Sequence, residues 1–212
     1  MVRRCKKDAE RTRDSIIRAA RSVFAKKGVS RSTLEEVARA AGVTRGAVYW
    51  HFKNKKDLFF AMREQTVLPL IDDAEHCACS VSGDDPLGNV EQFLLSVVDA
   101  MKKDPATRSV LETMTFRCEF VDELKPALLV QAKQFAGKIA TLAEVYKQAQ
   151  TDGSLREGID PQIAAVETLS FLVGLVRLWL LDRSGTMVRG RTTAIIKAHV
   201  GARRRPAGPE FA

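Results

Sequence analysis

The sequence lacks the features that would place it among strand-rich, disulfide-bonded or membrane proteins. Aromatic residues make up only 7% of the 212 residues and valine-rich alternating runs are scarce, so β-strands are not expected. The four cysteines have no framework spacing, which favours a reduced cytoplasmic protein over a disulfide scaffold. No apolar run approaches about twenty residues, and the basic N-terminus leads into no apolar core. We therefore expect neither a membrane span nor a secretory signal.

Groups for catalysis and metal binding are also scarce. The chain has three histidines and isolated carboxylates, with no Ser–His–Asp spacing and no glycine-rich phosphate loop, so we do not expect an enzyme. His76, Cys77 and Cys79 offer three ligands, whereas a structural zinc site takes about four. We expect no metal and no cofactor, and the sequence leaves the role of Cys77 and Cys79 open.

Positive charge, in contrast, is abundant in one part of the chain. The formal net charge is +8, and residues 1–56 hold 16 Lys or Arg against 5 Asp or Glu. Residues 57–200 hold 15 Lys or Arg against 20 Asp or Glu. A surface that is merely soluble would mix the two signs. The concentration of cations therefore predicts a nucleic-acid-binding segment near the N-terminus.

Residues 33–52 show the pattern of two short helices joined by a tight turn. Thr33 is placed to cap the first helix, and Glu36 completes a capping box. Gly42 is expected to supply the positive φ that ends this helix, and Thr44 to cap the next one. This pattern predicts a helix-turn-helix whose second helix enters the DNA major groove.

The rest of the chain has the apolar periodicity of helices, so the predicted fold class is all-α. We expect a flexible basic arm over 1–9, a three-helix DNA-binding domain over 10–56, a C-terminal domain over 57–203 and a disordered tail over 204–212. A fourth helix should run from Asn54 to about residue 70. The other predicted helices cover residues 89–103, 105–116, 123–151, 161–181 and 192–203.

The predicted helix over 161–181 is apolar on nearly every face and must be buried, either inside its own domain or against a partner subunit. Because a helix-turn-helix protein usually reads two half-sites with two-fold symmetry, we expect a homodimer. The residues predicted for the interface are Phe171, Leu175, Leu178 and Trp179.

The stretch Gly42–Lys55 resembles the signature of the TetR family of bacterial repressors. Within that family the chain is similar to AcrR-type regulators of multidrug efflux pumps, on the segments Phe116–Val121 and Gly174–Leu180. The resemblance implies an N-terminal three-helix DNA-binding domain and a C-terminal helical domain for effector binding and dimerisation. It also implies a dimer that leaves its operator when a lipophilic or cationic drug binds.

Nine residues are predicted to contact double-stranded operator DNA. Arg45 is the candidate for base reading, since bidentate Arg–guanine contacts are the commonest specific ones. The resemblance implies phosphate contacts for Tyr49, His51 and Lys55, while Trp50 could instead pack between helices. The full set is Thr33, Thr44, Arg45, Gly46, Ala47, Tyr49, Trp50, His51 and Lys55.

The effector site is predicted only loosely, because an apolar or methionine stripe at helical spacing is usually core. The candidates are Glu64, Phe93, Met101, Glu112, Phe116, Glu119, Phe120 and Phe135. Three alternatives stay open at this point: a regulator of a metabolic or other non-efflux operon, an all-α enzyme or carrier with a basic N-terminus, and a structural DNA binder without sequence preference.

Overall fold

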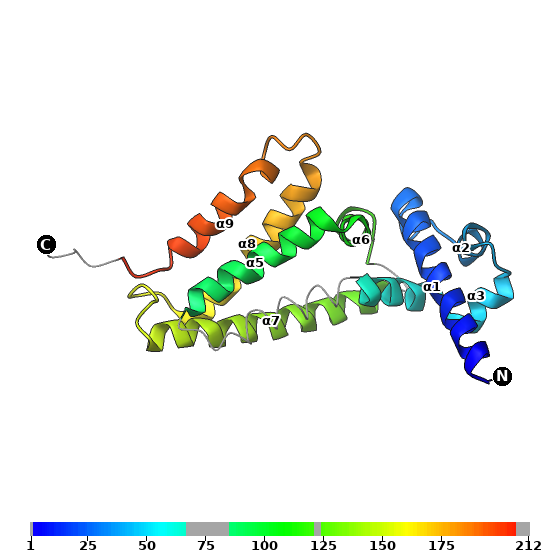
Figure 1. The fold of residues 1–212 in the computed structure, drawn as a ribbon, viewed down its shortest axis with the longest axis horizontal. Coiled ribbons are helices and arrows are strands. Elements are labelled where there is room, and N and C mark those ends of the chain that lie inside the picture. The colour runs from blue at the N-terminus through cyan, green and yellow to red at the C-terminus, as the bar shows by residue number, and fades with distance from the viewer. Residues whose placement is uncertain (1, 67–84, 121–123, 207–212) are drawn as a thin grey trace, which may run out of the picture. The chain divides into compact units, whose positions relative to one another are not determined.

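The computed structural model describes residues 2–66, 85–120 and 124–206 (Figure 1). In these ranges the regular structure is helical, apart from one isolated β-bridge between Leu155 and Arg204. The predicted all-α fold is confirmed. The helices are α1 (Val2–Lys27), α2 (Leu34–Ala41), α3 (Arg45–His51), an unlabelled helix that covers residues 55–66, α5 (Pro86–Lys103), α6 (Pro105–Phe116), α7 (Lys125–Thr151), α8 (Pro161–Leu181), the short 3₁₀-helix η2 (Arg189–Arg191) and α9 (Thr192–Gly201).

The chain forms two compact units that differ from the expected domains. The first unit combines Met1–Pro69 with Asp104–Val130, and the second combines Leu70–Lys103 with Gln131–Ala212. The sequence had placed residues 104–130 in the C-terminal domain. In the structure α6 packs on α1, and the Val29 N–H donates a hydrogen bond to the Arg117 carbonyl oxygen at 2.9 Å.

The first unit is built around α1, which packs against α2, α3 and α6. Apolar side chains at helical spacing on each element are buried together: Ile16, Ile17, Phe24, Leu34, Val37, Val48, Phe52, Leu58, Phe59, Met62 and Val110. Residues 2–9, expected to form a flexible arm, belong to α1 instead. The arm contains Arg, Lys and Ala, which are good helix formers, and extending an existing helix avoids the cost of nucleation.

The second unit contains α5, most of α7, α8 and α9. Its buried residues include Leu87, Leu94, Met101, Leu142, Tyr146, Leu172, Trp179 and Ile196. Asp160 caps α8, because its carboxylate accepts the Ile163 N–H at 2.9 Å. At the other end of α8, the buried carboxylate of Asp182 accepts the N–H groups of Met187, Val188 and Arg189. These bonds hold the connection to α9 in one conformation.

The first residues of the predicted disordered tail are ordered. The Arg204 guanidinium forms two bonds to the carboxylate of Asp85, at 2.9 and 2.8 Å, and the Arg205 N–H donates to the Ser154 carbonyl. The contact between Arg204 and Asp85 joins positions too far apart for sequence spacing to reveal. Residues 207–212 lie outside the described residues.

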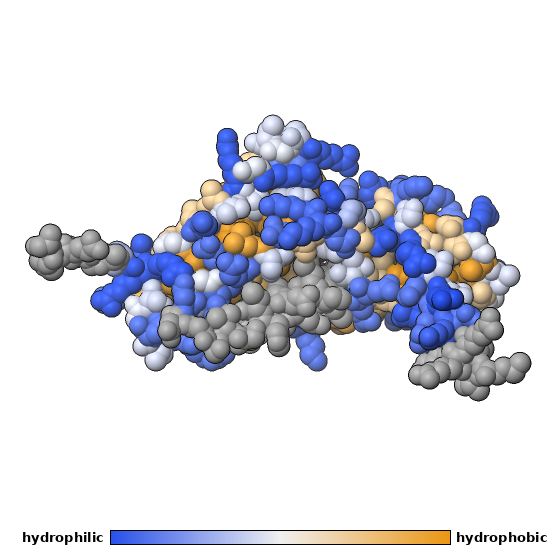
Figure 2. All heavy atoms as spheres, in the orientation of Figure 1, coloured by the Kyte–Doolittle hydropathy of each residue, from blue (hydrophilic) through white to orange (hydrophobic). Residues whose placement is uncertain are grey.

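Helix α8 corrects one further expectation. Its 21 residues are long and apolar enough to cross a membrane by length and composition, although no such run was expected. Burial within the second unit accounts for 44% of the apolar window, and the core helix of a soluble protein passes the same test. Figure 2 shows that hydrophobic residues reach the visible face in patches among hydrophilic ones.

Candidate nucleic-acid interface

The helix-turn-helix has the capping chemistry predicted for it. The Thr33 hydroxyl accepts the Glu36 N–H at 3.2 Å, and the Glu36 carboxylate accepts the Thr33 N–H at 3.2 Å, which forms a capping box. Gly42 ends α2 with a φ of 68°. The Thr44 hydroxyl accepts the Ala47 N–H at 3.2 Å and starts α3. The side chains of Thr33 and Thr44 therefore cap the starts of the two helices, and Gly42 ends the first of them.

Helix α3 is anchored on one face and free to contact DNA on the other. Val48 and Phe52 are buried against the rest of the first unit. The predicted contact residues Thr33, Thr44, Arg45, Gly46, Tyr49 and Trp50 are exposed, while Ala47, His51 and Lys55 are half-buried. Trp50 is 73% exposed, so it does not pack between helices of this chain. Such an arrangement matches a recognition helix that presents its outer face to the major groove.

Arg45 is tied to the preceding helix. Its Nε lies 3.0 Å from Oε1 of Glu35, and its guanidinium carbon lies 5.3 Å from the centre of the Tyr49 ring. A side-chain hydrogen bond with Tyr49, followed by the charge of Glu35, raises the pKa of Arg45. Sequence reasoning did not single out Glu35, because the contact forms only when α2 and α3 are folded against each other.

Lys55 has a structural contact that the sequence did not predict. Its ammonium donates to the carbonyl oxygens of Ser30 at 2.9 Å and Ser32 at 3.2 Å, in the connection between α1 and α2. Asn54 caps the helix that begins beside it, since its side-chain oxygen accepts the Asp57 N–H at 2.9 Å. Lys55 therefore links the start of this helix to the α1–α2 connection.

His51 sits at the end of α3 in a partly buried position. Burial, and then the charge of Arg13, lower the pKa of His51 below its ordinary value. Its ring lies edge-on to Trp50, with ring centres 4.5 Å apart. Both effects favour the neutral imidazole in the absence of DNA, and a ring N–H can donate a hydrogen bond to a phosphate.

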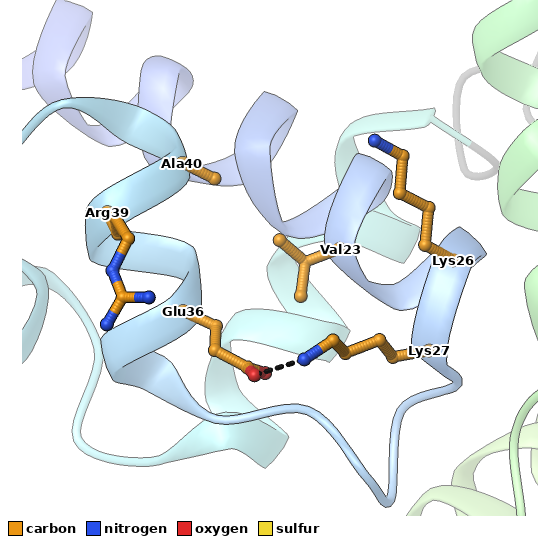
Figure 3. Close-up of a pocket in the computed structure, with 6 residues that line it drawn as sticks. All are labelled: Val23, Lys26, Lys27, Glu36, Arg39 and Ala40. Carbon is orange, nitrogen blue, oxygen red and sulfur yellow. Dashed lines mark hydrogen bonds and ion pairs between the residues drawn. The ribbon is translucent and has the colours of Figure 1, made fainter.

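A shallow pocket of about 260 Å³ lies between α1 and α2 (Figure 3). Val23 and Ala40 contribute its apolar lining, and Lys26, Lys27, Glu36 and Arg39 its polar lining. Lys27 and Glu36 form an ion pair across it, and the hydrogen bond from Lys27 lowers the pKa of Glu36. The ion pair joins the end of α1 to the first turn of α2. It therefore helps to hold α2, the helix before the turn of the motif, against α1.

The eight residues expected to line an effector site are divided between the two units. Glu64, Glu112, Phe116, Glu119 and Phe120 belong to the first unit, and Phe93, Met101 and Phe135 to the second. Phe93 and Met101 are buried on α5, Phe120, Phe135 and Glu112 are half-buried, and Phe116, Glu64 and Glu119 are exposed. The effector site remains a prediction.

The residues expected at a dimer interface occupy different faces of α8. Trp179 is only 3% exposed, and Leu175 is also buried. The Arg189 guanidinium carbon lies 4.1 Å from the Trp179 ring centre, and Arg189 Nε donates to the Trp179 carbonyl at 2.9 Å. Leu178 is exposed and Phe171 is half-buried. Trp179 and Leu175 therefore belong to the core of the subunit, so the interface prediction is corrected at these two positions.

A polar network connects three helices of the second unit. The Tyr146 hydroxyl on α7 lies 2.7 Å from the Thr168 hydroxyl on α8, which lies 3.2 Å from Nε2 of His199 on α9. The His199 ring stacks on Phe171, with centres 3.9 Å apart. Burial, and then the charge of Arg203, lower the pKa of His199 to about 4. Sequence spacing does not indicate this network, because its members are far apart in the chain.

The possible metal ligands His76, Cys77 and Cys79 lie outside the described residues. Within the ranges that the structure covers, no three His, Cys, Asp or Glu side chains gather as a metal site would require. Cys118 is a free cysteine in these ranges, and burial raises the pKa of its thiol to about 11.

Comparison with known proteins identifies the family. The sequence model of the bacterial regulatory proteins of the tetR family matches residues 16–62, which contain the helix-turn-helix. A second sequence model, of the C-terminal region of MAATS-type transcriptional repressors, matches residues 85–201. This chain belongs to the TetR family. The assignment fits the capped α2–turn–α3 unit and confirms the resemblance on Gly42–Lys55.

Relatives of this TetR-family protein are named as regulators. This chain is 40% identical over 190 residues to the HTH-type transcriptional regulator TtgR of Pseudomonas putida, and the match covers 85% of this chain and 86% of that protein. The crystal structure of NalD, the secondary repressor of the MexAB-OprM multidrug efflux pump in Pseudomonas aeruginosa, is 31% identical with a TM-score of 0.82 and covers 95% and 100% of the two chains. A complex of SmeT with triclosan, at 27% identity and a TM-score of 0.80, covers 92% and 93%. SmeT is the repressor of the Stenotrophomonas maltophilia pump SmeDEF.

Proposed function

We propose that this protein is a transcriptional repressor that binds operator DNA as a homodimer and controls a multidrug efflux operon. The observation that carries the proposal is the α2–turn–α3 unit, which lies in the match to the family and presents Arg45, Tyr49 and Trp50 on an exposed face. The excess of cations over residues 1–56 provides phosphate affinity. The efflux operon is inferred from the roles named for NalD and SmeT.

The proposed dimer uses the outer face of α8. Five apolar side chains on this helix are between 44% and 60% exposed: Ile163, Val166, Val173, Leu178 and Leu181. Ile163, Val166, Val173 and Leu181 follow spacings of three, seven and eight residues and therefore share one side of the helix. Exposed apolar side chains gathered on one side of a helix favour an interaction surface, here one that also carries Ser170 and Arg177. A second copy would cover this side of α8 by two-fold symmetry.

The proposed effector is a lipophilic or cationic small molecule. The triclosan complex of SmeT supports a lipophilic effector. In the first unit, the candidate residues offer the aromatic rings of Phe116 and Phe120 together with the carboxylates of Glu112 and Glu119. The effector acts by favouring a conformation whose two recognition helices no longer fit major grooves about 34–36 Å apart. It weakens operator binding only by its differential affinity for the two conformations.

The relatives are transcription regulators, so we propose no catalytic activity and a cytoplasmic location with access to the chromosome. Fluorescence anisotropy tests the function. The purified protein is titrated into labelled DNA from upstream of its own gene, with and without excess random competitor. Binding that survives the competitor supports a sequence-specific repressor. Equal affinity for both DNAs would instead indicate a structural DNA binder, and no binding would indicate a carrier or an enzyme.

A further inference from the structure

We propose that Glu35 is a positioning residue that orients Arg45 for reading a guanine, and that it also weakens binding to random DNA. The inference rests on the proposed DNA-binding function and assigns a specificity role to a residue on α2, outside the recognition helix. Glu35 is the second residue of α2, and Arg45 is the first residue of α3. The ion pair between them therefore crosses the turn of the motif.

The contact uses one particular nitrogen of the arginine. Oε1 of Glu35 lies 3.0 Å from Nε of Arg45. A guanidinium has five N–H groups, one on Nε and two on each Nη. Bidentate reading of guanine needs two parallel N–H groups directed at its O6 and N7 atoms. An acceptor on Nε leaves the four Nη N–H groups, which are enough to bond Tyr49 and still direct two N–H groups at a base edge.

Tyr49 restricts the same guanidinium from a second direction. The residues are one helical turn apart on α3, and the guanidinium carbon lies 5.3 Å from the Tyr49 ring centre. Because arginine has many rotamers, a side chain held at Nε and over a ring loses less conformational freedom when it meets a base. The two contacts together orient the guanidinium before DNA arrives.

The Glu35–Arg45 ion pair is exposed to solvent, so an effect on base preference can be measured apart from an effect on folding. The side chains of Arg45 and Glu35 are 66% and 43% exposed. Exposed ion pairs contribute little to stability, so removing this pair should leave the fold intact while its effect on base preference is measured. A carboxylate beside the reading arginine also repels DNA phosphates. Glu35 is therefore expected to lower affinity for random DNA while it raises the preference for guanine, and these opposite effects are its signature.

A purely structural role for Glu35 makes a different prediction. An acidic residue in the first turn of a helix interacts favourably with the helix dipole. If this were its whole effect, replacing Glu35 would lower the melting temperature and leave every base preference unchanged. Base preference is therefore the measurement that distinguishes a positioning residue from a structural one.

The experiment first uses the wild-type protein to select duplexes from a random-sequence pool. Arg45→Ala then identifies the guanine that Arg45 reads, as the base pair at which this variant becomes indifferent to substitution. Anisotropy titrations at one salt concentration compare the selected duplex, its single substitution at that base pair and a random duplex. The proteins are wild type, Glu35→Ala, Glu35→Gln and the control Glu10→Gln, which removes an exposed carboxylate of α1.

We expect Glu35→Ala to reduce the preference for guanine at that base pair by about tenfold and to raise affinity for the random duplex about threefold. Glu35→Gln should retain most of the preference, because its amide oxygen still accepts from Nε, while random binding rises as in Glu35→Ala. The control should leave the guanine preference unchanged. Circular dichroism melts confirm that each variant is folded.

Three results would overturn the inference, and they differ in what else they reject. If Arg45→Ala loses the preference while Glu35→Ala keeps it to within about twofold, Glu35 does not position Arg45 and the repressor function stands. If Arg45→Ala leaves every base preference unchanged, Arg45 is not a base reader. If the wild-type protein selects no sequence from the pool, the proposed function itself fails.

Discussion

Lys55 and Ser30 lie 25 residues apart in the sequence, yet the Lys55 ammonium is 2.9 Å from the Ser30 carbonyl oxygen. A second bond, to the Ser32 carbonyl at 3.2 Å, completes the contact. The α1–α2 connection is thus attached to the helix that follows the recognition helix. A residue expected to meet only DNA phosphate also holds the motif together.

Replacing Lys55 with methionine should therefore affect stability as well as DNA binding. The variant keeps the aliphatic stem but removes both hydrogen bonds, and we expect the free energy of unfolding to fall by about 1 kcal/mol. Urea denaturation measures this loss. The matched control is Lys53→Met, which removes the same charge from an exposed neighbour. Equal stability of the two variants would show that the carbonyl contacts contribute nothing.

The same variants test the phosphate contact predicted for Lys55. Loss of one phosphate contact reduces the slope of log affinity against log salt by about one unit per subunit. It weakens specific and random DNA binding equally, because a phosphate carries no sequence information. An unchanged slope in Lys55→Met would limit Lys55 to its structural role.

The dimer prediction separates a surface residue of α8 from a core residue. Val173→Arg places a charge on the exposed apolar face, so the protein should stay folded while its dimer dissociation constant rises by at least about 100-fold. Trp179→Glu buries a carboxylate inside the subunit and should cost more than about 3 kcal/mol of stability. Analytical ultracentrifugation and thermal melts measure the two effects. A Val173→Arg protein that remains a tight dimer would place the interface elsewhere.

Local chemistry explains what could be predicted from the sequence. The ends of α2 and the start of α8 follow from Thr33, Gly42 and Asp160, whose capping roles depend on neighbours within a few residues. The all-α class follows from apolar periodicity in the same way. The recognition helix was predictable because its caps, its buried Val48 and its exposed residues all lie within one short segment.

Contacts between distant segments explain what could not be predicted. An all-round apolar helix does not say which of its faces meets its own chain, so the burial of Trp179 was not evident. The partners of Lys55, Glu35 and His199 become neighbours only after the helices pack. The residues of α1 that precede Glu10 were not predicted because apolar periodicity begins only after them.

His199 should remain neutral well below neutral pH. Its pKa of about 4 lies below the ordinary histidine value of about 6.5 because the ring is partly buried and faces Arg203. Folding therefore favours the neutral ring, and the stability that this adds is complete above pH 6.5 and lost as the pH falls towards 4. Nuclear magnetic resonance of the ring should therefore show no titration midpoint of His199 near pH 6.5, because the pKa is lowered to about 4. A midpoint near pH 6.5 would contradict the buried geometry.

Triclosan should lower the affinity of the protein for its operator, and operator DNA must lower the affinity for triclosan by the same factor. The complex of SmeT makes this molecule the reasonable first probe. A coupling of about 1–3 kcal/mol would lower operator affinity roughly 5- to 150-fold, and operator DNA would then weaken triclosan binding by the same factor. Calorimetric titration of triclosan into the free protein and into the protein–operator complex measures both sides of this relation.

Phe116→Ala should weaken triclosan binding, whereas the control Leu129→Ala, an exposed apolar residue of the same unit, should not. Equal triclosan affinity in the two titrations would mean that triclosan is not an inducer, however tightly it binds, because a ligand with no preference between two conformations shifts neither.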